Sequence, residues 1–98
     1  MLRHVVLFAW VPEATGEQKQ HVIDELRTLP PLLSGLRAFD IGPDAGVVAA
    51  SNFDCALVAD FDDAESYLAY RHHPAHQEII ERVIDPISRQ RVAVQYEI

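Results

Sequence analysis

Four short segments of the chain carry the alternating, β-branched and aromatic pattern that is typical of strands, and longer segments between them show helical spacing of apolar residues. The pattern predicts strands at residues 3–10, 36–41, 54–61 and 89–97, and helices at residues 15–29, 64–72 and 74–84. Because Pro74 must interrupt the last helical stretch, the order is β-α-β-β-α-β with a broken second helix. This order predicts a ferredoxin-like α+β fold, in which helices cover one face of a four-stranded antiparallel sheet.

The first and third predicted strands are apolar on both faces. In the first strand, alternation places His4, Val6 and Phe8 on one face and Val5 and Leu7 on the other. The helices of one copy cover a single face, and an exposed apolar patch on the order of several hundred Å² is larger than a monomer normally tolerates. We therefore predict a two-fold symmetric homodimer in which the open sheet faces pack against each other.

The segment between the second and third strands has an unusual composition for a loop. Its middle, Val47-Val48-Ala49-Ala50, is entirely apolar, whereas loops normally lie in water. We expect this segment to pack against another surface. A partner subunit is the first interpretation, and a mobile lid is the second.

Length, charge and cysteine content narrow the class of protein. The 98 residues suit a single domain over residues 1–98. The formal net charge is −7 and the chain has no run of lysine or arginine, which argues against nucleic acid or an anionic membrane as a partner. The single cysteine, Cys55, excludes an intrachain disulfide and fits a reducing compartment. Because no segment has the roughly 18 consecutive apolar residues of a membrane span, we expect a cytoplasmic protein.

Titratable residues gather in the heptapeptide Tyr70-Arg71-His72-His73-Pro74-Ala75-His76, which holds three of the five histidines. His72 and His76 have the i, i+4 spacing that can place two imidazoles on one helical face as metal ligands. Pro74 puts them on different helical segments, and no third ligand stands at a suitable spacing. We therefore predict no metal site here and interpret His72 as a solvated residue.

His76 differs from its neighbours because it aligns with the inward-facing apolar positions of the helix that begins at Pro74. Burial and the positive end of the helix dipole both favour a neutral imidazole. A neutral imidazole that faces a cavity can act as a general base, although a core histidine with one hydrogen bond would fit the same pattern. Tyr70 is either an ordinary packing residue or one whose hydroxyl reaches the cavity rim, and His4 lies either at this cavity or in the dimer interface.

Other kinds of chemistry find little support in the sequence. No serine has glycine on both sides, and Cys55 has no basic partner nearby in the sequence, so a nucleophilic mechanism is not favoured. The chain also lacks a glycine-rich phosphate loop. We therefore predict a site that needs no cofactor.

Several segments resemble the stress-responsive dimeric α/β-barrel (Dabb) family. They are Arg3-His4-Val5-Val6-Leu7-Phe8, Phe39-Asp40-Ile41-Gly42, Asn52-Phe53-Asp54 and, above all, Tyr70-x-x-His73-Pro74-Ala75-His76. The resemblance extends over nearly the whole chain, and its last element is the most specific. It implies a ferredoxin-like monomer and a homodimer that closes a barrel between two sheets, in agreement with the apolar pattern.

The resemblance also implies roles for the candidate residues. Some members of the family are polyketide cyclases, in which the tyrosine and the last histidine of the motif carry out acid–base chemistry and a first-strand histidine lines the pocket. These positions correspond to Tyr70, His76 and His4. The cyclases place an aspartate that orients the histidine before the final-strand tyrosine, whereas this chain has Gln95 there. A glutamine can accept a hydrogen bond from an imidazole but cannot stabilise an imidazolium as a carboxylate does.

Two functions are compatible with these observations. We favour a stress-responsive dimeric barrel protein that binds a small apolar or polyketide-like molecule between sheet and helices. The alternative is a cofactor-independent cyclase or lyase, with His76 as general base and Tyr70 as hydrogen-bond donor. A monooxygenase of another dimeric-barrel family is disfavoured, because the Tyr-x-x-His-Pro-x-His element does not indicate one.

Overall fold

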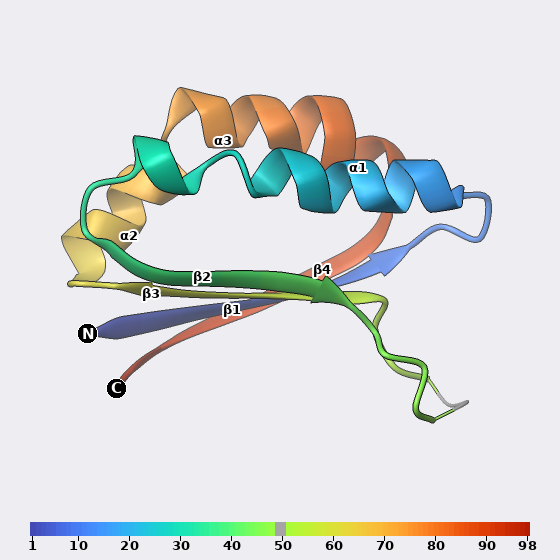
Figure 1. The fold of residues 1–98 in the computed structure, drawn as a ribbon, viewed down its shortest axis with the longest axis horizontal. Helices are drawn as coiled ribbons and strands as arrows, with labels where there is room; N and C mark the ends of the chain where they lie inside the picture. Colours follow the sequence, from blue (N-terminus) through green and yellow to red (C-terminus); the bar gives the residue numbers. More distant parts are fainter. Residues whose placement is uncertain (49–50) are drawn as a thin grey trace.

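The computed structural model describes residues 1–48 and 51–98 and contains the predicted order of strands and helices (Figure 1). The strands are β1 (Leu2–Trp10), β2 (Leu36–Pro43), β3 (Cys55–Phe61) and β4 (Ser88–Glu97). The α-helices are α1 (Gly16–Leu26), α2 (Ala64–Arg71) and α3 (Pro74–Ile79), and short helical turns of other types cover Pro30–Leu32, Ile80–Ile84 and Asp85–Ile87. Among the described residues, no helix combines the length and the apolar content that a bilayer crossing requires.

The four strands form one antiparallel sheet in the order β2-β3-β1-β4. β1 lies between β3 and β4, so that His4 pairs with Ala59 of β3 on one side and with Gln95 of β4 on the other. All three α-helices lie on the same side of the sheet in Figure 1, and the opposite face is uncovered. The predicted ferredoxin-like fold with helices on one face is therefore confirmed.

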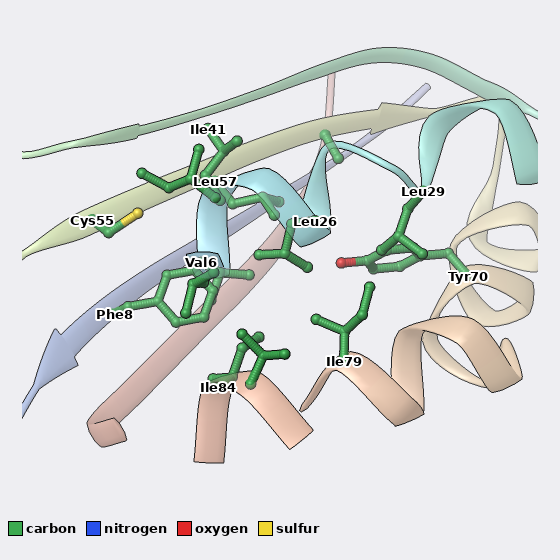
Figure 2. Close-up of a cluster of buried hydrophobic side chains, with 14 of the residues drawn as sticks. Val6, Phe8, Leu26, Leu29, Ile41, Cys55, Leu57, Tyr70, Ile79 and Ile84 are labelled. Atoms are coloured by element: carbon green, nitrogen blue, oxygen red, sulfur yellow. The ribbon is translucent and has the colours of Figure 1, made fainter. Parts of the chain in front are cut away.

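The hydrophobic core lies between the helices and the covered face of the sheet. Its fully buried side chains come from both layers: Val22, Leu26, Leu29, Leu57, Phe61 and Ile84. Figure 2 shows side chains of the sheet and of the helices meeting in this core, with Tyr70 reaching into it from α2. Burying one large apolar side chain contributes about 1.5–3 kcal/mol relative to leaving it exposed, so this contact holds the two layers together.

Helix α1 begins as predicted and ends earlier than predicted. Thr15 is its N-cap and forms a capping box with Gln18, in which each residue's side chain accepts from the other's backbone N–H. The regular helix stops at Leu26 because Thr28 and Leu29 donate to carbonyls three residues back, in a tighter turn that leads into Pro30. Leu29 nevertheless remains fully buried.

Helix α2 buries Tyr67 and Tyr70 and exposes Leu68. Helical spacing groups Leu68 with Tyr67 on one side of the helix and places Tyr70 at the margin of that side, but Leu68 is 48% exposed and Tyr70 is 3% exposed. The physical reason is the packing of two large rings, because Tyr67 and Tyr70 both contact the ring of Phe61, with centroid distances of 5.8 and 5.3 Å. Burying these rings outweighs the burial of one leucine.

The predicted break at Pro74 separates α2 from α3. His73 is the N-cap of α3, and its Nδ1 accepts a hydrogen bond from the N–H of Ala75 at 3.1 Å. The proline stands at the first helical position, where its missing N–H has no helical partner to lose. The sequence therefore predicts this junction correctly.

The segment after α3 corrects the predicted helix of residues 74–84. Its second half is a π-helical turn, Ile80–Ile84, in which the N–H of Asp85 donates to the Ile80 carbonyl. In a regular α-helix the ring of Pro86 would clash with the carbonyl of Arg82 four residues earlier, and the wider turn avoids that clash. Ile84 stays on the buried side.

The loop between β2 and β3 is held at its two ends. The Asp44 N–H donates to the carbonyl of Asp54 at 2.8 Å, and the Asp44 carboxylate accepts from Asn52 Nδ2 at 3.1 Å. Val47 is 86% exposed and Val48 is also exposed, so neither packs into the core of its own chain. The remaining residues of the predicted apolar run, Ala49 and Ala50, lie outside the described residues.

The uncovered face of the sheet is apolar along β4 and its neighbour β1. The exposed apolar side chains on this part of β4 are Val92, Val94 and Tyr96. They stand opposite Leu7, Val5 and Arg3 of β1 in the antiparallel register. The alternation of β4 places Ala93 and Gln95 on the other face, where they stand opposite Val6 and His4 of β1 in the same register.

Candidate functional site

A cavity of about 280 Å³ lies between the helical layer and the sheet. Its apolar wall comprises Val6, Phe8, Leu26, Leu57, Ile80, Ile84 and Ala93. Its polar and aromatic lining comprises His4, Tyr67, Tyr70, Arg71, His76, Gln77 and Arg91. The volume is close to the lower end of the range of roughly 300–1,000 Å³ that is usual for ligand sites, so it suits a small molecule.

The helix break determines the tautomer of His76. In an unbroken helix the Arg71 carbonyl would accept from the N–H of Ala75, but that N–H is bonded to His73. The Arg71 carbonyl instead accepts from His76 Nδ1 at 3.2 Å and from Gln77 Nε2 at 2.8 Å. Because a carbonyl can only accept, His76 Nδ1 carries the proton. In the neutral ring Nε2 is then unprotonated and is the nitrogen that can take up a proton.

His4 lies on the helix-facing side of β1 and is 5% exposed, so it lines the cavity and not the open face. Its Nδ1 is 2.8 Å from Nε2 of Gln95, its direct partner across the β1–β4 ladder. Gln95 stands where the family's cyclases carry an orienting aspartate. In this chain its hydrogen bond goes to His4, while the Nδ1 of His76 bonds a backbone carbonyl.

The Tyr70 ring lies between the two histidines. Its centroid is 4.3 Å from that of His76 and 5.8 Å from that of His4. No buried side-chain nitrogen or oxygen within the described part of the chain lacks a hydrogen-bond partner. Figure 2 shows the hydroxyl oxygen of Tyr70 directed away from α2 into the interior of the cluster. Tyr70 therefore contributes a phenol to the lining of the cavity.

Burial is the main cause of the altered acidity of all three groups. It lowers the pKa of His4 from 6.5 to about 4, and nearby positive charge at His76 and Arg71 lowers it further. Burial also lowers the pKa of His76, against the raising effect of its hydrogen bond to the Arg71 carbonyl. It raises the pKa of Tyr70 well above its usual value of 10. At neutral pH the site thus combines two neutral imidazoles with a protonated phenol.

The structure brings together the three residues that the sequence singles out: His4, Tyr70 and His76 all line this cavity. Among the further lining residues that the prediction omits are two charged ones, Arg71 and Arg91. Alternation along β4 carries a signal for Arg91, which shares a face with Ala93 and Gln95. That signal can be used only once it is known which face of the sheet the helices cover, and the three-dimensional structure supplies that knowledge.

Other reactive groups stand apart from the cavity. Within residues 1–48 and 51–98, no three His, Cys, Asp or Glu side chains come close enough to hold a metal ion. His72 is exposed at the end of α2, on a different helix from His76. Burial raises the pKa of the Cys55 thiol to about 11, so this cysteine is a protonated core residue at neutral pH.

The fold and its cavity define a ferredoxin-like domain with a small pocket between sheet and helices. The sequence matches the Dabb family, the stress responsive A/B barrel domain, over residues 2–98. The chain therefore belongs to the Dabb family, and the resemblance stated from the motif is confirmed. No protein of curated function matches the chain significantly.

Solved structures similar to this chain have the same fold. A dimeric ferredoxin-like protein of unknown function from Thermobifida fusca YX is 37% identical, with a TM-score of 0.90 and coverage of 99% of this chain and 90% of the other. The hydroxynitrile lyase from Passiflora edulis is 20% identical, with a TM-score of 0.84 and coverage of 99% and 95%. A Dabb family protein from Mesorhizobium loti MAFF303099 is 15% identical, with a TM-score of 0.81 and coverage of 99% and 95%. The likeness to the last two concerns the fold alone.

The lowered pKa of His4 predicts a loss of stability in acid. Between pH 6.5 and about 4, the unfolded chain binds a proton at this residue and the folded chain does not, so the free energy of unfolding falls as the pH falls. A shift from 6.5 to about 4 corresponds to roughly 3 kcal/mol. Over this pH range, the free energy of unfolding of His4→Gln should therefore fall by roughly 3 kcal/mol less than that of the wild type. Urea unfolding at a series of pH values measures both.

His21→Gln is the matched control, because His21 is an exposed histidine on α1. It should reproduce the pH dependence of the wild type. Parallel stability curves for the wild type and His4→Gln would contradict the burial of a neutral imidazole at position 4.

Proposed function

We propose that this protein forms a homodimer through its open sheet face and binds a small, largely apolar molecule in the cavity. The observation that carries the binding function is a volume of about 280 Å³ with an apolar inner wall and a few convergent polar groups. Ligand sites have this composition, whereas close-packed cores leave few voids larger than a water molecule. In this proposal His4, Tyr70 and His76 orient the bound molecule through hydrogen bonds.

Support for the homodimer comes from the open face and from a relative. The Thermobifida fusca protein, 37% identical, is described as dimeric. In a single copy of this chain, Val92, Val94 and Tyr96 are exposed side by side on the open face. Packing two such sheets face to face would remove these side chains from water.

The same face carries a charged pair that is compatible with burial in an interface. Arg3 and Asp60 form a bidentate ion pair, with Nε–Oδ1 at 2.7 Å and Nη2–Oδ2 at 2.9 Å. A buried charge is tolerated when a partner satisfies its hydrogen bonds, and here each partner is supplied within one subunit. We further propose that the exposed Val47 and Val48 pack against the second subunit.

A second candidate function is catalysis of proton transfer, and the tautomer of His76 favours it. Its unprotonated Nε2 could remove a proton from an activated carbon, while the Tyr70 hydroxyl donates to the oxygen on which negative charge develops. A cofactor-independent cyclase or lyase would use these two groups. The Passiflora edulis lyase has the same fold at 20% identity, so the proposal depends on the geometry of His76 and Tyr70.

Filling the cavity should abolish ligand binding. Ala93 lines the cavity from the edge strand β4 and is exposed, so Ala93→Trp adds a large ring there without opening the core. We expect the wild type to bind hexan-1-ol and Ala93→Trp to bind it about tenfold or more weakly. Backbone amide shifts in an NMR titration measure both affinities and identify the residues affected.

Leu68→Trp adds the same ring at an exposed position of α2 that does not line the cavity, and it should bind like the wild type. If Ala93→Trp and the wild type bind hexan-1-ol with equal affinity, the cavity is not the binding site. The absence of any shift change at cavity residues in the wild type would do the same.

A charge on the open face should separate the subunits. Val94 is 56% exposed in a single copy and lies near the middle of β4. Burying an unpaired carboxylate in an interface costs several kcal/mol, so Val94→Asp should raise the dimer dissociation constant by about 10²-fold or more. Sedimentation equilibrium at micromolar concentration should find a dimeric wild type and a monomeric variant.

Leu68→Asp is the control, because it places the same charge at a similarly exposed leucine on the helical side of the molecule. It should remain dimeric. A wild type that sediments as a monomer at these concentrations would refute the dimer.

A carbon acid that fits the cavity can test His76 as a base. In 5-nitrobenzisoxazole, removal of the proton on C3 breaks the N–O bond and releases a coloured cyanophenolate. The wild type should accelerate this ring opening, and His76→Gln should lower the rate constant by about 10²-fold. The rate of the wild type should fall as the pH drops through the pKa of His76, which lies below 6.5.

His21→Gln should keep the full rate, because His21 is exposed on α1 and does not line the cavity. If His76→Gln is as fast as the wild type while both remain folded dimers, His76 is not a general base.

A further inference from the structure

The cavity is more positively charged than the composition of the chain predicts. The chain has 15 acidic residues against 8 basic ones. Nevertheless, two of the eight basic residues, Arg71 and Arg91, line the cavity, and no aspartate or glutamate of the described residues does. A site without carboxylates in so acidic a chain concentrates positive potential where a ligand would sit.

Both arginines are available to a ligand. Elsewhere in the chain Arg3, Arg37 and Arg82 are each bonded to carboxylates of their own chain. Within residues 1–48 and 51–98, neither Arg71 nor Arg91 has an ion-pair partner or a side-chain hydrogen bond. A guanidinium fork matches a carboxylate in a bidentate pair, and such charge-assisted hydrogen bonds are stronger than neutral ones.

The two arginines reach the cavity from different elements of the fold. Arg71 ends α2 and Arg91 stands on β4. The positive charge of Arg91 lowers the pKa of both Tyr70 and His76, and the charge of Arg71 also lowers the pKa of His76. The cavity lining places both arginines beside this polar cluster, because Arg71 and Arg91 line the same cavity as Tyr70 and His76. The two arginines themselves are exposed, which puts them at the opening, while the apolar residues form the inner wall.

Among anionic groups, a carboxylate fits this opening better than a phosphate. Phosphate sites usually rely on free backbone N–H groups at a helix start or in a glycine-rich loop. At the start of α3 few such donors remain, since Pro74 has no N–H and the N–H of Ala75 bonds to His73 Nδ1. The donors that remain are planar guanidinium forks, which suit a planar carboxylate.

We propose that the natural ligand is a small amphipathic organic acid, with its carboxylate held by Arg71 and Arg91 and its apolar part against the inner wall of the cavity. The proposal rests on the ligand-binding function proposed above and specifies the class of the ligand. The inner wall, formed by residues such as Val6, Leu26 and Leu57, takes the hydrocarbon part. The small volume restricts the acid to a short chain or a single ring.

Three six-carbon probes that differ in the head group test this proposal: hexanoate, hexan-1-ol and hexylammonium. At low ionic strength and neutral pH, we expect hexanoate to bind about tenfold more tightly than hexan-1-ol, and hexylammonium to bind most weakly. Arg71→Gln and Arg91→Gln should each weaken hexanoate binding by roughly fivefold and leave the affinity for hexan-1-ol unchanged. Added salt should reduce the preference for hexanoate. NMR titration with the dimeric protein measures all of these affinities.

Arg89→Gln is the matched control, because it removes the same charge from the same strand at an exposed residue that does not line the cavity. It should keep the preference for hexanoate. If hexan-1-ol binds in the cavity as tightly as hexanoate, the anionic ligand is refuted and the binding function stands. If neither probe binds, both proposals fall. Tighter binding of hexyl phosphate than of hexanoate would also overturn the assignment to a carboxylate.

Discussion

The register of β1 between β3 and β4 decides which side chains reach the helices and which remain on the uncovered face. Helices cover a single face of this sheet, so a slip of one residue would exchange the two sets. Arg3 would then enter the core and His4 would leave the cavity. Two hydrogen-bonded contacts on opposite faces oppose that slip, namely the Arg3–Asp60 ion pair and the His4–Gln95 hydrogen bond. The core, the cavity and the open face therefore all depend on one ladder alignment.

Pro74 imposes a second constraint, which turns a helix end into part of the site. The break leaves the Arg71 carbonyl without its usual helical donor, and the side chains of His76 and Gln77 take that place. The same break makes His73 an N-cap whose imidazole is occupied by a backbone N–H. Neighbouring histidines thus have different roles because of their positions relative to one proline. The ordinary need to satisfy a backbone carbonyl is what protonates His76 on Nδ1 and leaves Nε2 unprotonated in the neutral ring.

Much of this architecture is predictable from the sequence, and the exceptions have physical causes. The order of elements, the capping of α1 and the alternation of β4 follow from local patterns. The buried side of α2 does not, because ring packing of Tyr67 and Tyr70 on Phe61 depends on where the end of β3 lies. The motif points to Tyr70 and His76 directly. By contrast, assigning His4 and Arg91 to the cavity requires knowing which face of the sheet the helices cover.

The pairing of β1 with β4 joins the two ends of the chain at the cavity. His4 and Gln95 are 91 residues apart in sequence, and β4 is an edge strand whose residues are largely exposed. Bringing such distant segments together has a loop-closure entropy cost, and an edge strand is held by one neighbour alone. Fraying of β4 would open the pocket by removing Arg91, Ala93 and Gln95 together. A ligand that contacts both β4 and the helices would oppose that fraying. Binding in the pocket and pairing of β4 with β1 would therefore be thermodynamically linked.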